Sequence, residues 1–276
     1  MSRALTFVAS RAIVVALVAA GGALTIAGAL PAGAASAYSV THATDPATGA
    51  STVVRWAPCT LTSTGAIKTH YITYRINTAG VPSRVRLVRD ALAKVTAASG
   101  LHFRYLGKTT YIPHNAVLHY ATGNRVVFDA AQERARTGAE LVVAWAKGSA
   151  SNLLTPGEAG VGTVSWSGNY KAQLRIVQGA VVMRRGVALK SGFIAGASVG
   201  SLLLHELGHA VGLNHVVLKS QMMYPTIGSW SRGWYHYGDL AGLRVVGRPA
   251  GCFRTAASAP ANPAAMARAA GVTVTG

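Results

Sequence analysis

Three histidines and one glutamate of this chain stand at a spacing that suits a metal site which activates water. His205 and His209 are four residues apart, so on a helix their imidazoles share one face, one turn apart. Two imidazoles placed in this way can bind one metal ion. Glu206 projects next to them but in another direction, so its carboxylate stays free for a metal-bound water. These residues predict hydrolysis assisted by a metal.

A third ligand must come from beyond this helix. Gly212 permits the positive φ that ends a helix and turns the chain back, which would bring His215 to the metal. Three neutral imidazoles with one open position are typical of catalytic Zn²⁺, whereas structural sites are usually closed by four ligands and rich in cysteine. We therefore expect one zinc ion on His205, His209 and His215, with Glu206 as the catalytic residue.

The alternative is a helix whose histidines are ordinary core or surface residues. In a chain of this composition, the five fixed positions of H-E-x-x-H-x-x-G-x-x-H arise by chance with a probability on the order of 10⁻⁵. The metal site is therefore the favoured interpretation.

Residues 205–215 resemble the long zinc-binding motif of the metzincin metalloproteases and match it in full. Downstream, residues 221–225 (Gln-Met-Met-Tyr-Pro) look like the Met-containing turn of that clan, in the Met-Tyr-Pro form that is similar to matrixins. The resemblance implies that Met223 packs beneath the three imidazoles without binding the metal, with Met222 as its neighbour. It also implies an α+β metzincin-type catalytic domain, in which helices pack on a small twisted mixed sheet and the active-site helix carries HExxH.

Two further segments extend this likeness. Residues 55–59 (Arg-Trp-Ala-Pro-Cys) and 238–243 (Gly-Asp-Leu-Ala-Gly-Leu) look like secreted bacterial matrixin-like proteases, so the likeness covers most of residues 55–254. The chain departs from animal matrixins in the segment that holds their structural zinc and calcium. With eight acidic residues in the whole chain, we expect no calcium site. Four other histidines are expected to lie on the surface: His70, His102, His114 and His119.

Hydrophobic periodicity predicts the elements that position these groups. Residues 198–211 have apolar positions at helical spacing and stop at Gly212, so we expect the zinc motif on a helix. A second helix face runs through residues 81–95 and ends at Gly100, and a third helix starts at Asp239. Alternating or continuous apolar residues predict strands at 68–77, 101–105, 126–128, 141–145 and 172–183. This order predicts an α+β layout with helices packed on a small sheet.

Composition narrows the class of protein. Half of the 276 residues are apolar and 12% are charged, which excludes a disordered or coiled-coil protein and favours a compact core. The 26 lysines and arginines outnumber the eight acids, so the net charge is +18. Such a basic surface is either simply solvated or attracts an anionic polymer of the cell envelope. No zinc-finger, helix-turn-helix or RNP-like motif indicates a specific nucleic-acid partner.

Residues 1–37 have the pattern of a signal peptide. Two arginines precede an uncharged stretch that Pro31 ends, and residues 35–37 (Ala-Ser-Ala) fit a signal-peptidase site. The alternative is a retained membrane anchor, but the stretch is rich in glycine and alanine and therefore weakly hydrophobic. We expect cleavage after Ala37, a secreted protein, and no stable membrane insertion afterwards.

Three segments follow the signal peptide. Residues 38–54 lack periodicity and are predicted to be a flexible leader, residues 55–254 to be the metalloprotease catalytic domain, and residues 255–276 to be an Ala/Pro-rich disordered tail. Cys59 and Cys252 are the only cysteines, and in an oxidising compartment they predict one disulfide. The rival interpretation is a Cys59 thiolate that caps the metal and keeps an enzyme latent.

Together these features predict a secreted zinc endopeptidase that acts as a monomer on protein or peptide substrates. Zinc lowers the pKa of its water towards roughly 7, and Glu206 accepts the proton and passes it to the leaving amine. An extended substrate would add a strand to an exposed sheet edge, for which we select Gly160 to Trp166.

Two other functions would use the same residues differently. One is a zinc amidase that acts on cell-wall peptides, with the same chemistry on another substrate. The other is a non-catalytic secreted protein that binds the cell envelope. An intact Glu206 disfavours the second, since binding alone requires no general base.

Overall fold

The computed structural model describes residues 37–45, 48–120, 123–169 and 173–254. The predicted tail at 255–276, and all of the predicted signal peptide except Ala37, lie outside these ranges. Among the described residues, no helix is both long enough and apolar enough to span a bilayer.

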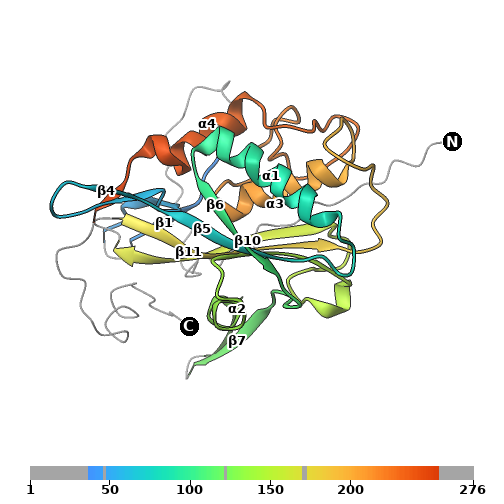
Figure 1. Ribbon diagram of the computed structural model, residues 1–276, viewed down its shortest axis with the longest axis horizontal. Helices are drawn as coiled ribbons and strands as arrows, with labels where there is room; N and C mark the ends of the chain where they lie inside the picture. The colour runs from blue at the N-terminus through green and yellow to red at the C-terminus, as the bar shows by residue number, and fades with distance from the viewer. Residues whose placement is uncertain (1–36, 46–47, 121–122, 170–172, 255–276) are drawn as a thin grey trace.

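A mixed sheet of seven strands forms the centre of the domain (Figure 1). Its strands are β1 (His42–Thr44), β2 (Ser51–Arg55), β5 (Tyr71–Asn77), β6 (His102–Lys108), β9 (Leu141–Ala146), β10 (Gly160–Asn169) and β11 (Gln173–Arg184). The order is β1-β2-β11-β9-β5-β6, and β10 pairs with β11. Strands β5, β6, β9 and β11 are parallel to one another, and β10 is antiparallel to β11. The predicted mixed sheet of an α+β domain is therefore confirmed.

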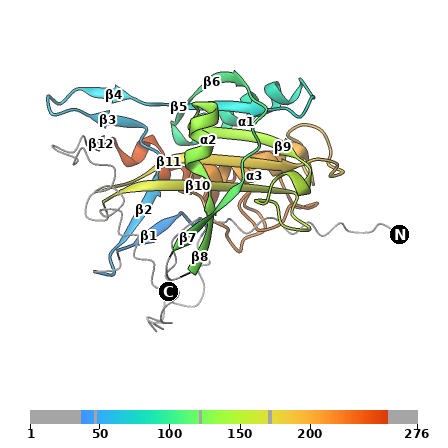
Figure 2. The same ribbon diagram turned by 90° about the horizontal axis from the view of Figure 1, so that it is seen from below.

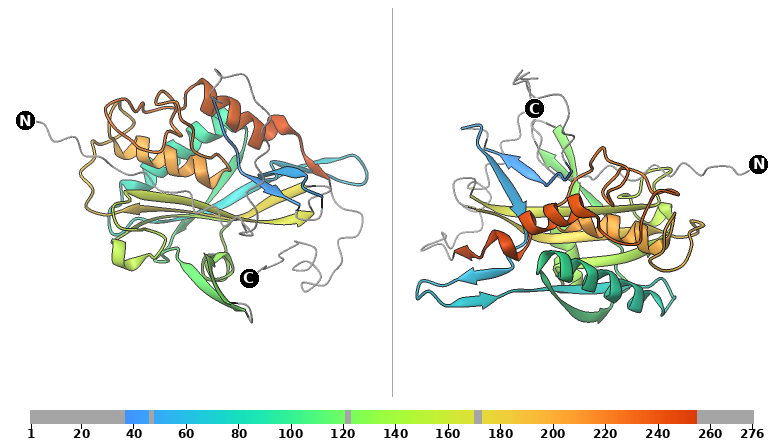
Figure 3. Two further views of the ribbon diagram at one scale, coloured as in Figure 1. Left: turned by 180° about the vertical axis from the view of Figure 1, so that it is seen from behind. Right: turned by 90° about the horizontal axis from the view of Figure 1, so that it is seen from above.

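Three helices cover one face of this sheet, as Figures 1 and 3 show. They are α1 (Arg84–Ser99), α3 (Val199–Ala210) and α4 (Tyr237–Val246). In α1 the apolar positions Val88, Leu92 and Val95 are buried in the core, and the helix ends at Gly100, whose φ is 69°. Val81 precedes the helix and is exposed, so α1 begins later than the periodicity predicts.

The opposite face of the sheet carries helix α2 (Ala130–Thr137) and a hairpin of β7 (Asn115–Tyr120) and β8 (Gly123–Phe128) (Figure 2). The prediction of a strand buried on both faces at 126–128 is wrong in its placement, because β8 pairs with the adjacent segment β7 and not with the main sheet. Helix α2 was not predicted, since it is short and mostly polar. The side chain of His119, on β7, lies outside the described residues.

Strand β9 is buried on both faces, as its continuous apolar run predicts. All six of its residues are buried. The main core lies between the sheet and the three helices. A second apolar cluster, which includes Phe128, Leu153, Val161 and Val182, covers the other side. The sheet therefore forms the middle layer of the domain, and it fixes the helices that pack on it.

The structure corrects the prediction that residues 38–54 are a flexible leader. Strands β1 and β2 fall in this range, and Val40 and Val54 are buried. The N–H of Thr41 donates to the carbonyl of Gly212 at 2.8 Å, just beyond the motif helix. Strands this short show no periodicity of their own, and β11, the strand that joins β2 to the main sheet, lies far along the chain. The packed domain therefore includes this segment.

A separate sheet of three strands consists of β12 (Phe253–Arg254), β3 (Cys59–Leu61) and β4 (Ile67–Thr69). Strands β3 and β4 extend from the body in Figure 2. Cys59 and Cys252 form the predicted disulfide, with their Cα atoms 4.7 Å apart. A Cys59 thiolate that caps the metal is incompatible with this bond. Two short 3₁₀ helices, η1 (Gly148–Ala150) and η2 (Arg248–Ala250), complete the described elements.

Candidate metal centre

Helix α3 carries the predicted metal-binding motif through the centre of the domain. Ser198 caps its first turn, since the hydroxyl accepts the N–H of Ser201 at 3.0 Å. Every residue from Gly200 to Ala210 is buried, so surrounding side chains hold the helix in one orientation. Gly212 then turns the chain with a φ of 106°, a backbone conformation that favours glycine.

This turn places His215 next to the two histidines of the helix. The Nε2 atoms form a nearly equilateral triangle: His205 lies 3.2 Å from both His209 and His215, and His209 lies 3.1 Å from His215. A tetrahedral Zn²⁺ with Zn–N bonds of 2.0–2.1 Å would hold its nitrogens ~3.3 Å apart. The donor set and its spacing therefore fit one zinc ion. Among the described residues, this is the single cluster of three or more metal-ligating side chains.

The surroundings keep these imidazoles oriented and neutral. Nδ1 of His205 lies 2.8 Å from the carbonyl oxygen of Met222, and Nδ1 of His209 lies 2.9 Å from that of Leu213. Because a carbonyl only accepts, each Nδ1 carries the proton and each Nε2 lone pair faces the centre. Burial lowers the pKa of His205 to about 3 and that of His215 to about 4, and it also lowers the pKa of His209. Neutral imidazole is the form that binds a metal.

Glu206 is fully buried on the same helix. Neither of its carboxylate oxygens has a hydrogen-bond partner among the described residues. Burial, and after it the negative charge of Glu158, raises the pKa of Glu206 well above its ordinary value. A buried carboxylate without partners is costly, unless a cation and a water molecule supply the missing interactions. This unpartnered group is a second, independent sign that the centre is built for a metal ion.

The edge strand β10 lies directly against the motif helix. A Cβ atom at Gly160 would stand 2.8 Å from Oε1 of Glu206, and one at Gly162 would stand 2.8 Å from Cβ of His209. Real Cβ atoms do not approach so closely, so glycine is required at Gly162, where the backbone of Glu206 would also be struck, and a side chain at Gly160 would displace the Glu206 carboxylate. Among the described strands, β10 pairs with β11 alone. The sheet edge that we selected for the substrate therefore lies beside the metal centre.

The segment after His215 packs against the motif helix. Met223 is 1% exposed, and its sulfur packs against Gly208 so closely that any side chain there would collide with it. Asp239, in the first turn of α4, accepts the N–H of Met222 at 2.7 Å and that of Met223 at 3.1 Å. The sequence pattern predicts Asp239 only at the start of a helix, with no part in the site. Acidic residues are rare in this chain, which has only eight, and this rarity was the one feature of the sequence that could have drawn attention to Asp239.

Of the four histidines expected at the surface, the three whose side chains the structure describes take no part in this centre. Nε2 of His70 lies 3.1 Å from the carboxylate of Glu140, and Nε2 of His114 lies 3.5 Å from that of Asp129. His102 is half-buried beside an aromatic ring. All three lie near the surface as expected, but the two carboxylate partners were not predicted.

The motif helix lies on a mixed sheet, a glycine turn returns the third histidine to it, and Met223 packs against Gly208 of the helix. This is the arrangement of a metzincin zinc metalloprotease. Comparison with protein families agrees, since residues 67–243 match peptidase family M10, the matrixins. This chain therefore belongs to the matrixin family of zinc metallopeptidases.

Two solved structures are among those to which the chain is similar. Metalloproteinase-II from Bacteroides fragilis has 13% identity and a TM-score of 0.35, over 68% of this chain and 53% of that one. High choriolytic enzyme 1, a hatching enzyme zinc-protease from Oryzias latipes (Medaka fish), has 12% identity and a TM-score of 0.23, over 52% of this chain and 44% of that one. The chain thus spans about half the length of these proteins. No curated protein matches its sequence.

Proposed function

We propose that this matrixin is a secreted endopeptidase in which Glu206 is the general base. The observation that carries the proposal is the buried, unpartnered carboxylate of Glu206 on the helix that supplies two of the three clustered imidazoles. A zinc ion held by those imidazoles would supply Lewis-acid activation of the scissile carbonyl and of water. Glu206 accepts a proton from the attacking water and delivers it to the leaving amine.

Burial suits Glu206 to this role. Because burial raises the pKa of its carboxyl, the protonated form that exists between the two proton transfers is stabilised. A nearby cation would act in the opposite direction and favour the carboxylate. Burial and a bound cation therefore act in opposite directions on the pKa of this carboxyl.

The substrate is proposed to bind along the edge strand β10. An extended peptide could pair, through main-chain hydrogen bonds, with the edge of β10 that no other described strand occupies, so recognition would depend little on side chains. The strand is 10 residues long, which is enough to hold residues on both sides of the cleaved bond. This length favours cleavage within a chain over removal of single terminal residues.

Secretion is supported by two features of the chain. The disulfide between Cys59 and Cys252 is a bond that persists in oxidising compartments. The first 37 residues have the charge pattern and the small residues of a cleaved signal peptide. N-terminal sequencing of the exported protein should begin at Tyr38, and detection of the uncleaved chain in the membrane fraction would contradict the proposal.

The central test compares Glu206→Gln with the unaltered protein in the hydrolysis of casein. We expect kcat/KM to fall by about 10²–10⁴-fold, the usual contribution of a general base. Zinc content, measured by atomic emission, should remain one ion per chain. The control is Asp90→Asn, which makes a similar acid-to-amide change at an exposed position of α1 and should leave activity unchanged. Wild-type rates in Glu206→Gln would overturn the assignment of the general base.

A separate measurement distinguishes proteins from cell-wall peptides as the substrate. Rates on unstructured proteins and on cell-wall peptides should be compared with and without 1,10-phenanthroline, followed by added Zn²⁺. We expect chelator-sensitive cleavage of proteins that zinc restores. Preferential cleavage of cell-wall peptides would show that the zinc amidase is the correct function instead.

A further inference from the structure

Residues 39–41, close to the start of the described chain, pair with the turn that follows the motif helix. Val40 and Leu213 lie opposite each other in an antiparallel bridge. Two main-chain hydrogen bonds flank this bridge, from the N–H of Thr41 to the carbonyl of Gly212 at 2.8 Å and from the N–H of Asn214 to the carbonyl of Ser39 at 2.9 Å. The backbone between the second and third histidines of the metal centre is therefore held on both sides of Leu213.

Thr41 joins this turn to the main sheet. Its Oγ1 donates to Oδ1 of Asn214 at 3.1 Å, and the residue is only 2% exposed. Its carbonyl accepts the N–H of Val54, on β2, at 2.8 Å. One buried residue thus contacts the turn on one side and a strand of the sheet on the other, so the sheet fixes where the turn lies.

The same turn determines the orientation of two metal-binding rings. Nδ1 of His209 lies 2.9 Å from the carbonyl oxygen of Leu213, so the direction of this ring depends on the turn. His215 follows Asn214 directly, so the position of its backbone depends on the turn as well. A shift of residues 212–214 would therefore disturb two of the three imidazoles at once.

His215 has the fewest constraints of its own among the three histidines. The rings of His205 and His209 each have a carbonyl oxygen at Nδ1, but no hydrogen bond to Nδ1 of His215 is found among the described residues. His215 is also half-buried, whereas the other two are buried. Its order must therefore come from the backbone on either side.

The two neighbours of His215 have separate supports. Val216 donates its N–H to the carbonyl of Met223 at 3.0 Å. Every hydrogen bond that Asn214 forms with another described residue goes to Ser39 or Thr41. On the side of Asn214, the backbone of the third histidine is thus held by the N-terminal segment.

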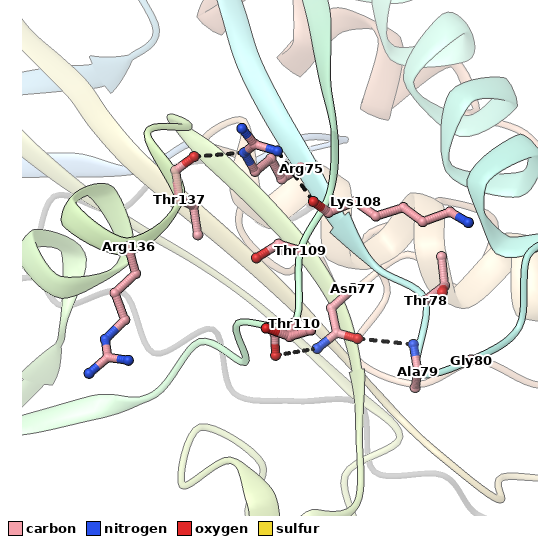
Figure 4. A pocket seen from close by; sticks show the side chains of 10 residues that line it. All are labelled: Arg75, Asn77, Thr78, Ala79, Gly80, Lys108, Thr109, Thr110, Arg136 and Thr137. Atoms are coloured by element: carbon pink, nitrogen blue, oxygen red, sulfur yellow. Dashed lines mark hydrogen bonds between the residues drawn. The ribbon is translucent and has the colours of Figure 1, made fainter.

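A cavity of about 560 Å³ at the ends of β5 and β6 is not part of this network (Figure 4). The guanidinium of Arg75 is occupied by the carbonyls of Thr137 and Lys108, at 2.7 Å and 3.2 Å. The charged ends of Lys108 and Arg136 lie on opposite sides of the cavity and point apart. Because its charged groups do not converge on one ligand, we assign no ligand to this cavity.

We propose that residues 39–41 are a positioning segment of the metal centre, in which Thr41 holds the turn that carries His215 and orients His209. The proposal rests on the zinc chemistry of the proposed function. With the turn held, the imidazoles stand in place before the metal arrives, which lowers the entropy cost of binding it. Signal-peptide cleavage after Ala37 would leave this segment on the mature chain, whereas a cut a few residues later would remove it and weaken zinc binding.

The zinc affinity of the full chain, measured by competition with a chromophoric chelator, tests this proposal. Thr41→Val replaces the hydroxyl by a methyl group of similar size and should weaken zinc binding by about 3–10-fold, the usual effect of one lost hydrogen bond. Thr41→Ser keeps the hydroxyl and should bind zinc as the unaltered protein does. The matched control, Thr44→Val, makes the same change at an exposed position of β1 and should leave the affinity unchanged.

The visible absorption spectrum of the Co²⁺-loaded protein gives a second readout, because its bands depend on the number and geometry of the ligands. The bands should weaken in Thr41→Val and stay unchanged in Thr41→Ser and Thr44→Val. Neither measurement uses a substrate, so both are independent of the role of Glu206 and of the substrate class. Absence of zinc binding by the unaltered protein would contradict the proposed function itself.

Other results would overturn the positioning role alone. An unchanged zinc affinity and Co²⁺ spectrum in Thr41→Val, with a lower free energy of unfolding, would show that the segment only stabilises the fold. Equal weakening in Thr44→Val would show that zinc affinity follows any change on this strand. Weak zinc binding by Thr41→Ser would show that the hydroxyl is not the group that holds the turn.

Discussion

Nδ1 of His205 lies 2.8 Å from the carbonyl oxygen of Met222, a residue 17 positions later in the chain. The N–H of the same Met222 donates to the carboxylate of Asp239 at 2.7 Å. A path of hydrogen bonds therefore runs from the first metal-binding ring, through the Met-turn, to the start of α4. The direction of the Nε2 lone pair of His205 depends on this path, because the bond at Nδ1 sets the orientation of the ring.

The substitution Asp239→Asn should weaken zinc binding by about 10–100-fold, the usual effect of losing a partner behind a metal ligand. Three N–H groups, those of Met222, Met223 and His236, converge on this carboxylate, and an amide offers one accepting oxygen instead of two. Competition with a chromophoric chelator measures the zinc affinity. Asp90→Asn is the control and should leave it unchanged; an unchanged affinity in Asp239→Asn would show that the Met-turn holds the ring without the carboxylate.

The substitution Gly162→Ala should lower the free energy of unfolding by about 1–3 kcal/mol, the usual cost of overpacking. The new methyl group would collide with the backbone of Glu206 and with Cβ of His209. Gly179→Ala makes the same change on β11, where the nearest atoms are 3.4 Å away, and should cost much less. Urea denaturation followed by tryptophan fluorescence gives both values. Similar losses would mean that the close approach of β10 to α3 is not what requires glycine.

Glu133 should make the protein less stable as the pH rises. Its carboxyl is buried, and burial raises its pKa well above 4.5. Gln178 donates to one oxygen at 2.6 Å, and the other has no partner among the described residues. The folded state keeps a proton that the unfolded state releases above about pH 4.5, so this contribution to stability is present below that pH and is lost as the pH rises. Glu133→Gln should therefore be more stable than the unaltered protein at pH 7.5, by about 1–3 kcal/mol.

Urea denaturation at pH 5 and pH 7.5 measures this effect, and the advantage of Glu133→Gln should shrink at the lower pH. Glu140→Gln provides the contrast. Burial acts to raise the pKa of Glu140, but hydrogen bonds from His70 and Thr73 outweigh it and lower that pKa. The stabilisation from Glu140 is thus present at neutral pH and lost on acidification, so Glu140→Gln should destabilise at pH 7.5. A pH-independent difference in Glu133→Gln would rule out ionisation of Glu133 as the cause.

Loss of the disulfide should lower stability without loss of the metal centre. Cys59→Ser/Cys252→Ser should reduce the free energy of unfolding by about 2–5 kcal/mol, because the bond joins residues 193 positions apart. Neither cysteine belongs to the metal centre, so hydrolysis at 25 °C should persist in the folded variant. A rise in activity on reduction of the unaltered protein would instead support a latency role for Cys59.

Local sequence patterns predicted those helices and strands whose hydrophobic periodicity is complete within one stretch of the chain. The helix expected at 198–211 is α3, shorter by one residue at each end, and it is followed by the expected turn at Gly212. The same periodicity could not place β8 or detect β1 and β2. β1 and β2 are too short to show a periodicity of their own, and the pairing of β8 with β7 in place of the main sheet is decided by tertiary structure.

The sequence by itself determined which side chains can bind zinc, because residue type, helical spacing and a glycine turn are all present within eleven consecutive residues. Tertiary structure alone decided what surrounds them: the carboxylate of Asp239 behind the Met-turn and the approach of Gly162 to the motif helix. Each of these depends on contacts between segments far apart in the chain, and packing of the whole sheet and its helices, not local spacing, brings such segments together.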